Sequence, residues 1–216
     1  MSASFPLVTC IMPTRNRHDF ARRSIALFQA QDYPRKRLLI FEDGDARSVG
    51  QPPPTDVIYV RSPVYKSIGE KRNAMCTVST GEIIAHWDDD DWHSPRRLSA
   101  QVEAMRAQGA RLCGLDRLVF YNGERAWLFQ TPRKPWLAGG TLMYERSLWQ
   151  EQPFANMSDG EDTAFVDAAY KRGVKIAILT DESLYVATLH DSNTTKRDTS
   201  RLGGSYDADT VRRWME

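Results

Sequence analysis

The sequence predicts a single α/β domain built on an open, mixed, mainly parallel sheet flanked by helices. Short apolar runs rich in β-branched residues alternate with amphipathic stretches that lie next to prolines. Parallel strands need long crossover connections, which are usually helices, so this alternation favours βαβ units. No internal repeat and no long linker divides the 216 residues, and their number fits one domain.

Strands and helices alternate regularly in the first half of the chain. The first apolar run is stopped by Pro13, as is typical of a short buried strand. Between residues 18 and 31, Ala21, Ile25 and Phe28 share one helical face. We expect strands at Leu7–Met12, Leu38–Phe41, Val57–Val60 and Ile83–Trp87, helices over 18–31, 69–79 and from Pro95 onward, and no regular structure at Pro52–Pro54.

The second half mixes strands and helices less regularly. Its apolar runs predict strands at Leu112–Tyr121, Trp127–Gln130, Thr141–Tyr144, Lys175–Leu179 and Leu184–Leu189, a helix over 161–172 and a weaker one over 207–215. The stretch from Ser192 onward is polar and contains glycine. We therefore expect one domain over residues 1–193, followed by a tail over 194–216 with a short helix.

The charge of the chain is nearly balanced. Lys and Arg total 29 against 28 Asp and Glu, a formal net charge of +1. Proteins that bind nucleic acid or a membrane surface through basic patches carry a positive excess, so this balance argues against both classes. No apolar window approaches the length of about 18 residues typical of a transmembrane helix. The segment Met1–Pro6 lacks the pattern of a signal peptide.

The cysteines predict no disulfide framework and no zinc site. Cys10, Cys76 and Cys113 are an odd number, lie far apart and include no CxxC pair. Their apolar or small neighbours predict small buried side chains. Thiols used in this way are typical of a reducing compartment, so we expect a cytoplasmic protein.

Acidic residues follow two of the predicted strands. Asp43 comes after the second strand, and the run Asp88–Asp91 comes directly after Trp87. In open α/β sheets, ligands bind beyond the carboxyl ends of the strands. Both acidic segments are therefore candidates for a ligand site at that edge of the sheet.

The spacing within the aspartate run favours metal binding. Residues two apart in an extended chain face the same side, so Asp88 and Asp90 are expected to point together. Converging carboxylates repel each other unless a cation joins them, and oxygen ligands suit Mg²⁺ (magnesium) or Mn²⁺ (manganese), often shared with phosphate. The structural alternative is a solvated loop in which Asp91 or Ser94 caps the next helix.

Two more segments carry candidate functional groups. Lys66, Lys71 and Arg72 precede a predicted helix and are placed to meet a diphosphate or a nucleobase, or else to be surface charges paired with Glu70. They remain open between these two roles. These three basic residues follow the third predicted strand in the sequence.

The segment Ser158–Asp162 precedes another predicted helix. Ser158 and Glu161 have the spacing of a capping box, which is a purely structural role. Asp162 is not needed for that box. A carboxylate in the first helical turn is mildly stabilised by the helix dipole, but Asp162 is also a candidate general base for an acceptor hydroxyl.

His190 closes the last predicted strand. An isolated histidine there is most often structural, but beside an acidic metal site its neutral imidazole is a candidate ligand. Trp87, Trp92 and Trp136 are candidates for lining a sugar-binding cleft, although core packing explains Trp87 equally well.

Taken together, these residues resemble the inverting family 2 glycosyltransferases, which have the GT-A fold. The similarity runs from Leu7 to about Asn193, and the ordered set of motifs is specific. The segments that carry it are Ile11–Arg17, Phe41–Asp45, Arg72–Ala74, Thr80–Ile84, Trp87–Asp91, Leu137–Thr141 and Gly160–Asp162.

The resemblance implies a nucleotide-sugar-binding role for five residues. Pro13 and Thr14 match positions that line the nucleotide pocket, and Asp43 matches the residue that hydrogen-bonds the base. Arg72 is expected near the base and the phosphates, and Asp89 is expected to face the ribose.

The resemblance also implies the reacting centre. Asp162 matches the catalytic base of the family, and Gly139 and Gly140 are expected to let the chain approach the donor sugar. Asp88 and Asp90 are expected to hold the metal. His190 is similar to a C-terminal histidine of some members and is carried over as a further metal ligand.

The implied function is metal-dependent, inverting transfer of a sugar from a nucleoside-diphosphate sugar, with a UDP-sugar favoured, to an acceptor hydroxyl. The implied cofactor is Mn²⁺ or Mg²⁺. The acceptor stays open between a saccharide, a lipid and a protein; no nucleic acid is expected, and peripheral membrane contact stays open. The nucleotide-binding half is expected at about residues 1–95 and the acceptor half at about 96–193.

Three features depart from the family pattern. Arg15 stands where an aromatic residue is usual, which changes base stacking, and Pro52–Pro54 replaces a helix that commonly follows the second strand. The chain also stops soon after the fold, which argues against a processive polymerase.

Two other functions stay open. A sugar nucleotidyltransferase normally has a Gly-rich basic loop after the first strand, and Pro13–Arg17 contains no glycine. A non-catalytic nucleotide-sugar-binding protein is expected to lose base or metal residues, and neither set is lost.

Overall fold

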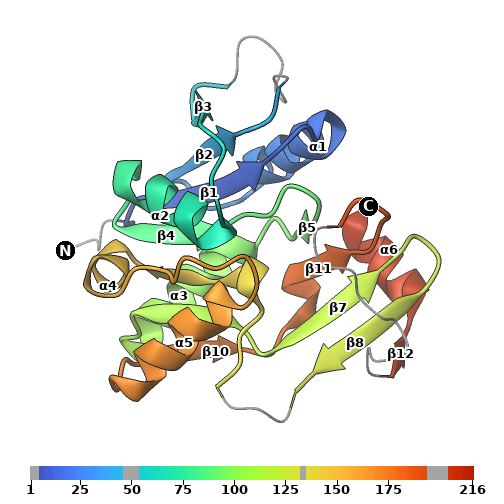
Figure 1. Cartoon of the computed structure of the whole chain (residues 1–216). Helices are drawn as coiled ribbons and strands as arrows, with labels where there is room; N and C mark the ends of the chain where they lie inside the picture. The colour runs from blue at the N-terminus through green and yellow to red at the C-terminus, as the bar shows by residue number, and fades with distance from the viewer. Residues whose placement is uncertain (1–4, 46–53, 132–134, 194–203) are drawn as a thin grey trace.

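Figure 1 shows the computed structural model of the chain, which describes residues 5–45, 54–131, 135–193 and 204–216. The strands of its main sheet are β1 (Val8–Thr14), β2 (Lys36–Glu42), β3 (Val57–Arg61), β4 (Ile83–His86), β6 (Leu112–Leu115), β9 (Met143–Glu145) and β10 (Ile176–Leu179). They lie in the order β10-β6-β9-β4-β1-β2-β3. All neighbours are parallel except β9, which is antiparallel to β4 and β6. The expected mainly parallel α/β sheet is confirmed.

Helices cover both faces of this sheet. One face carries α1 (His18–Gln29) and α3 (Arg97–Gln108), and the other carries α2 (Ile68–Val78), α4 (Arg146–Glu151) and α5 (Glu161–Lys171). Successive side chains of a strand point to opposite faces. Cys10 and Met12 therefore join the core with Phe28 of α1, while Ile11 joins the core with Phe165 of α5. Burial on both faces explains why these strands are continuous apolar runs.

A second sheet, which the sequence does not predict, lies beside the first (Figure 1). It contains β5 (Trp92–His93), β7 (Arg117–Tyr121), β8 (Ala126–Gln130), β11 (Tyr185–Thr188) and β12 (Ser205–Tyr206), in the order β12-β8-β7-β11-β5. Helix α6 (Ala208–Met215) buries Val211 in its core. This helix occupies the stretch for which a short helix is expected.

The apolar run Leu112–Tyr121 predicts one strand, but the chain changes sheets within it. β6 pairs with β9 and β10, whereas β7 pairs with β8 and β11. Between them, the backbone N–H of Asp116 donates to the carbonyl of Leu179 at 3.1 Å. Both strands are buried, so hydropathy alone gives no sign of the change.

The remaining differences concern the ends of elements and one additional helix. The helix expected from Pro95 begins at Arg97, because residues 95 and 96 form a turn. The short helix α4 was not expected. Of the predicted irregular stretch Pro52–Pro54, the first two residues lie outside the described residues.

The capping box expected at the start of α5 is wrong. Gly160 is the N-cap, with φ of 78°, and no side chain caps the helix. Glycine adopts a positive φ at less cost than any other residue, because it has no Cβ. The helix α2 instead has Ser67 as its N-cap, whose Oγ accepts a hydrogen bond from the N–H of Glu70 at 3.1 Å. Because the Glu161 carboxylate does not take part in a cap of α5, it can bind another partner.

The three cysteines are buried and free, as predicted. Burial raises the pKa of Cys10, Cys76 and Cys113 to about 12 each, so these thiols stay protonated and packed in the cores. Among the residues that the structure describes, no helix is long and apolar enough to span a membrane.

Candidate active site

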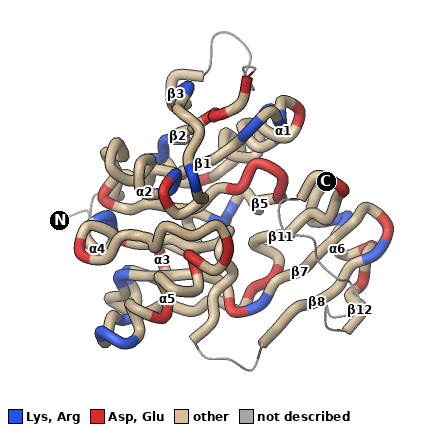
Figure 2. The backbone as a smooth tube through the Cα atoms, in the orientation of Figure 1, with Lys and Arg blue, Asp and Glu red and all other residues tan. Residues whose placement is uncertain are grey.

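A cleft of about 730 Å³ lies where the carboxyl ends of β1 and β4 meet the second sheet. Its walls include Pro13, Arg72, Asp88–Asp91, the short 3-10 turn η1 (Gly139–Thr141), the start of α5 and residues of β7, β8 and β11. Figure 2 shows acidic stretches in red both in the segment before β5 and at the start of α5. The predicted metal ligands Asp88 and Asp90 and the predicted base Asp162 thus share one cavity.

A second cavity of about 390 Å³ adjoins the cleft. Pro13 and Asp89 line both cavities, while Thr14 and Asp43 line the smaller one. Arg72 and Gly140 line the larger one. The structure therefore divides the predicted nucleotide-sugar residues between two connected compartments.

Asp89 and Asp90 share one cation, Arg17. Its Nη1 lies 2.9 Å from an oxygen of each carboxylate. Asp89 also accepts a hydrogen bond from Thr14 Oγ1 at 2.6 Å. Arg17, the N-cap residue of α1, therefore holds the carboxylates of two neighbouring aspartates on one guanidinium nitrogen.

Asp91 turns away from these groups. It accepts hydrogen bonds from the Tyr185 hydroxyl and, at 2.8 Å, from the backbone N–H of Thr188. The side chain of Asp91 therefore does not cap α3. Ser94 Oγ accepts a hydrogen bond from the backbone N–H of Arg96 at 3.4 Å in the turn before α3, while the N-cap Arg96 itself has no side-chain cap bond. Asp91 instead joins the second sheet to the site.

Burial and mutual repulsion disfavour the charging of the aspartates. Burial, reinforced by Asp90, raises the pKa of Asp89 to about 6. Burial also raises the pKa of Asp88 against the opposing field of Arg72, and raises that of Asp91 well above its usual range. A cation that enters such a site is favoured, because it relieves the repulsion.

Arg72 is buried at the inner end of the cleft. It pairs with Glu161, and its Nη2 lies 3.7 Å from Asp88. Burial alone lowers the pKa of Arg72, but Asp88 and Glu161 together raise it above its usual value. Its Nε is buried without a hydrogen-bond partner among the described residues, so this guanidinium retains one donor.

Lys71 is buried in the smaller cavity. Its Nζ lies 2.7 Å from Asp43 Oδ1 and donates to the carbonyl of Thr14 at 2.9 Å. Burial lowers the pKa of Lys71, which Asp43 partly opposes. Neither Lys71 nor Arg72 is a surface charge paired with Glu70, so that alternative is wrong for both.

Two consecutive glycines, Gly139 and Gly140, lie between Asp162 of α5 and Asp88 of the aspartate run. A Cβ at Gly139 would overlap the carboxylate of Asp162, and a Cβ at Gly140 would overlap Asp88 and the Tyr185 hydroxyl. Any side chain here would displace an acidic group. The turn η1 thus brings both carboxylates against backbone on the floor of the cleft.

Helix α3 holds this turn in place. Arg97 is fully buried and donates to the carbonyls of His86 at 2.8 Å and Gly140 at 2.9 Å. Gln101, one turn later, donates to the carbonyl of Thr141 at 2.7 Å. The Arg97 guanidinium also lies 5.4 Å from the ring of Tyr185. These contacts satisfy carbonyls that would otherwise be buried without partners.

His190 lies beside Asp90, with Nε2 3.1 Å from Asp90 Oδ2. The N–H of Ser192 donates to His190 Nδ1 at 3.2 Å, so Nε2 is the ring nitrogen that faces Asp90. Phe20 stacks on the imidazole with 4.4 Å between ring centroids. His190 is therefore oriented toward the aspartate run from the end of β11.

The donor set suits a hard divalent cation. Among the described residues, no three His, Cys, Asp or Glu side chains already converge as a complete metal site. Mg²⁺ and Mn²⁺, however, are often held by one or two carboxylates together with phosphate oxygens and water. Asp88 and Asp90 supply such carboxylates, and His190 lies next to the second. The residues fit a cation that arrives with a phosphate.

The candidate tryptophans have different roles. Trp87 and Trp92 are buried in the cores, and Trp87 donates to Ser24 Oγ at 2.8 Å. Trp136 lines the cleft. The suggestion of a cleft-lining role is thus wrong for the first two, which pack inside.

For several site residues, the sequence alone indicates no role. Arg17 lies within the motif after the first strand. A basic charge at the end of a strand is a local signal that could have predicted a partner for the acidic residues. Tyr185 and Arg97 carry no local signal, because the first belongs to the unpredicted sheet and the second resembles an ordinary helix residue. The carboxylate of Glu161 is explained there only by a capping box.

The family model of glycosyl transferase family 2 matches residues 9–173, well over half of the chain. The chain belongs to this family. Among curated relatives, WcaA of Escherichia coli (strain K12), by name a colanic acid biosynthesis glycosyl transferase, is 30% identical over 103 residues, which are 44% of this chain and 36% of WcaA.

Two solved structures have the same fold as this family 2 chain. TarS 1–349 of S. aureus, in complex with UDP-GlcNAc, has a TM-score of 0.70 at 15% identity over 88% of this chain and 62% of that chain. The mannosyltransferase PcManGT from Pyrobaculum calidifontis, in complex with GDP-Man and Mn²⁺, has a TM-score of 0.68 at 16% identity over 87% and 57%. The likeness confirms the GT-A fold. The chain spans less than two thirds of the length of each of these relatives.

Proposed function

We propose that this chain transfers a sugar from a nucleoside-diphosphate sugar to an acceptor hydroxyl, with inversion at the anomeric carbon. The observation that carries the proposal is the shared cleft, in which Asp162 and Asp88 flank the Gly139–Gly140 turn next to a smaller cavity lined by Asp43 and other nucleotide-pocket residues. The family assignment of residues 9–173 supports it.

The smaller cavity is assigned to the nucleoside. Asp43 is positioned by Lys71 to accept a hydrogen bond from the base, and Asp89, held by Thr14 and Arg17, faces the ribose. We favour a UDP-sugar, and the TarS complex with UDP-GlcNAc supports that choice. On this assignment the nucleotide half spans about residues 1–95 and the acceptor half about 96–193.

The diphosphate is assigned to the cleft between Arg72 and the aspartate run. Arg72 has a buried Nε that retains its donor capacity, and a guanidinium binds phosphate oxygens well. Asp88, Asp90 and His190 are proposed to hold Mn²⁺ or Mg²⁺. When bound, that cation neutralises the negative charge that develops on the departing diphosphate.

Asp162 is assigned as the general base. The acceptor hydroxyl oxygen attacks the anomeric carbon, its proton passes to the Asp162 carboxylate, and the bond from that carbon to the diphosphate breaks with its electron pair. Attack from the face opposite the leaving group inverts the carbon. No side chain acts as a nucleophile in this single displacement.

The two other functions are less well supported. A sugar nucleotidyltransferase would release pyrophosphate from a nucleoside triphosphate, and the segment after β1 has no glycine-rich loop to hold one. A non-catalytic nucleotide-sugar-binding protein has no need for a carboxylate on the far side of the turn that carries Gly140.

A thermal-shift screen of nucleotide sugars with Mn²⁺ tests the proposed donor class. A ligand at about 100 times its Kd stabilises a protein by about 2.7 kcal/mol, which corresponds to a rise in Tm of about 5–10 °C for a chain of this size. We expect UDP-sugars to give the largest rise. No shift with any UDP- or GDP-sugar at millimolar concentration would contradict the proposal.

A further inference from the structure

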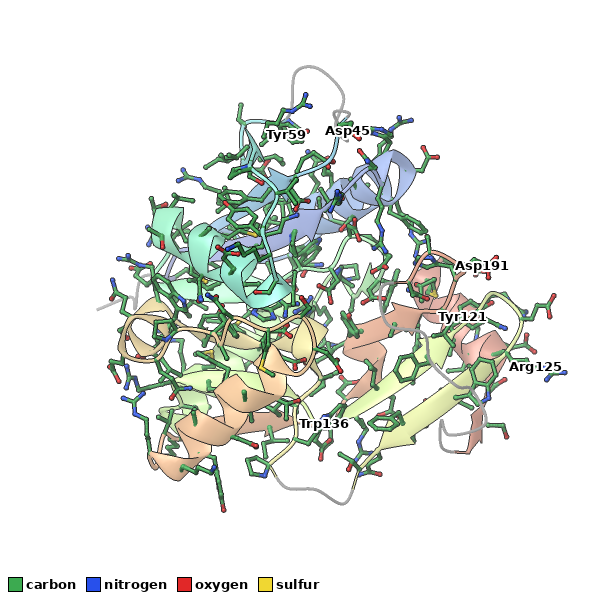
Figure 3. All side chains as sticks on the ribbon, in the orientation of Figure 1. Asp45, Tyr59, Tyr121, Arg125, Trp136 and Asp191 are labelled. Carbon is green, nitrogen blue, oxygen red and sulfur yellow. The ribbon has the colours of Figure 1, made fainter. Side chains whose placement is uncertain are left out.

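One wall of the cleft is aromatic, and the reaction proposed above does not use it. Leu118 and Phe120 of β7, Phe129 of β8 and Trp136 line this wall. The rings of Phe129 and Trp136 meet edge to face at 5.2 Å between centroids, and Phe120 meets Phe129 in the same manner at 6.3 Å. Such contacts fix ring orientation. Trp136 is half-buried, and Figure 3 shows it between α5 and the β7–β8 pair.

Polar groups line the same cleft from α5 and the segment before it. Asp162 lies at the start of the helix, and Thr163 and Asp167 follow with the spacing of four that places two residues on one helical face. Asp159 also lines the cleft and is exposed. The cavity therefore presents an aromatic surface together with several hydrogen-bond acceptors.

This combination discriminates among the acceptor classes. An alkyl chain would satisfy the aromatic wall but would offer no hydrogen-bond donor to the exposed carboxylate of Asp159, and taking that carboxylate out of water is costly. An extended peptide binds by adding a strand to a free sheet edge. The part of the wall on β7 is not such an edge, because β7 is already paired with both β8 and β11. A sugar ring has an apolar C–H face and a rim of hydroxyl donors, so it satisfies both surfaces.

We propose that this wall and the α5 carboxylates form the acceptor subsite, and that the acceptor is a saccharide whose pyranose ring stacks on Trp136. The inference rests on the proposed function, because it places the acceptor hydroxyl beside Asp162. The carboxylates Asp159, Asp162 and Asp167 repel anions, so the ring that binds here is a neutral one.

Saturation-transfer NMR on the whole chain with UDP and Mn²⁺ tests this subsite. The probes are methyl pyranosides of neutral sugars, with hexanol and a neutral hexapeptide in parallel samples. We expect saturation transfer to the ring C–H protons of at least one pyranoside. Trp136→Ala is expected to weaken the affinity for that pyranoside by about 5- to 10-fold, which is the loss expected from the free energy of an aromatic contact. Trp136→Phe keeps an aromatic ring, so it is expected to lose less of this affinity.

Tyr170→Ala is the matched control, since Tyr170 is 59% exposed on α5 and lies outside the cleft. It should leave pyranoside binding unchanged. The inference is overturned if all pyranosides bind Trp136→Ala and Trp136→Phe as well as the wild type, if none binds, or if only hexanol or the peptide responds to the substitutions. A UDP titration of every sample separates this result from the proposed function: failure of UDP binding counts against the function, and normal UDP binding without pyranoside stacking counts against the acceptor assignment alone.

Discussion

Asp162→Asn is expected to lower the rate of sugar transfer by about 100- to 10,000-fold, the range of a general base, while UDP affinity stays unchanged. Asparagine has the shape of aspartate but does not accept a proton. It can therefore keep the packing of this side chain against Gly139. Asp162 lines the larger cleft and not the cavity assigned to the nucleoside, so donor binding has no reason to weaken.

The measurement is the rate of UDP release from the donor sugar, with UDP affinity determined by calorimetry on the same samples. Asp19→Asn is the matched control, because Asp19 is exposed and also lies in the first turn of a helix. It removes the same helix-dipole interaction. Turnover by Asp162→Asn that equals turnover by Asp19→Asn would contradict the assignment of the base.

Asp90→Asn is expected to weaken UDP binding in the presence of Mn²⁺ by about 100-fold, or about 2.8 kcal/mol. The carboxylate loses its charge, and with it the attraction for the cation that the site is proposed to hold. The wild type in excess chelator should show a loss of similar size. Because the cation is proposed to join carboxylate and diphosphate, substitution and chelation together should weaken binding little further.

Calorimetric titration measures the UDP affinity of the wild type and of Asp90→Asn, each with Mn²⁺ and with excess chelator. Asp32→Asn, at an exposed aspartate remote from both cavities, is the control for loss of one negative charge. Asparagine at position 90 retains an oxygen for Arg17, so the local hydrogen bonding is largely preserved. Equal UDP affinity with and without chelator in the wild type would rule out a metal role for Asp88 and Asp90.

The chemistry-bearing positions on the first sheet could be predicted because their signals are local. Asp43 and Asp88–Asp91 directly follow apolar runs, and the edge formed by parallel strands brings such segments together. The motif order adds the identity of the family. For these residues, neighbours in sequence are also neighbours in the site.

The partners of those residues could not be predicted in the same way. Tyr185 reaches Asp91 from the second sheet, and that sheet depends on pairings between segments such as β5 and β11, which are far apart in sequence. Arg97 reaches Gly140 across the interior from α3. Contacts of this kind depend on the tertiary arrangement and leave no periodicity in the chain.

The capping box at Ser158 illustrates how a local rule fails. The spacing to Glu161 is correct, but Gly160 begins α5 in a left-handed conformation, and Glu161 pairs with the buried Arg72. An uncompensated guanidinium in the interior costs far more than a missing helix cap. The stronger interaction determines where the carboxylate lies.

The anomeric configuration of the first product tests the central claim most directly. Proton NMR of the reaction, started with the donor found in the nucleotide-sugar screen and a pyranoside acceptor, distinguishes an α from a β linkage in the product. A single displacement assisted by Asp162 predicts a product whose configuration is opposite to that of the donor. A product with the configuration of the donor would contradict the account, because retention requires a second displacement or attack from the face of the leaving group.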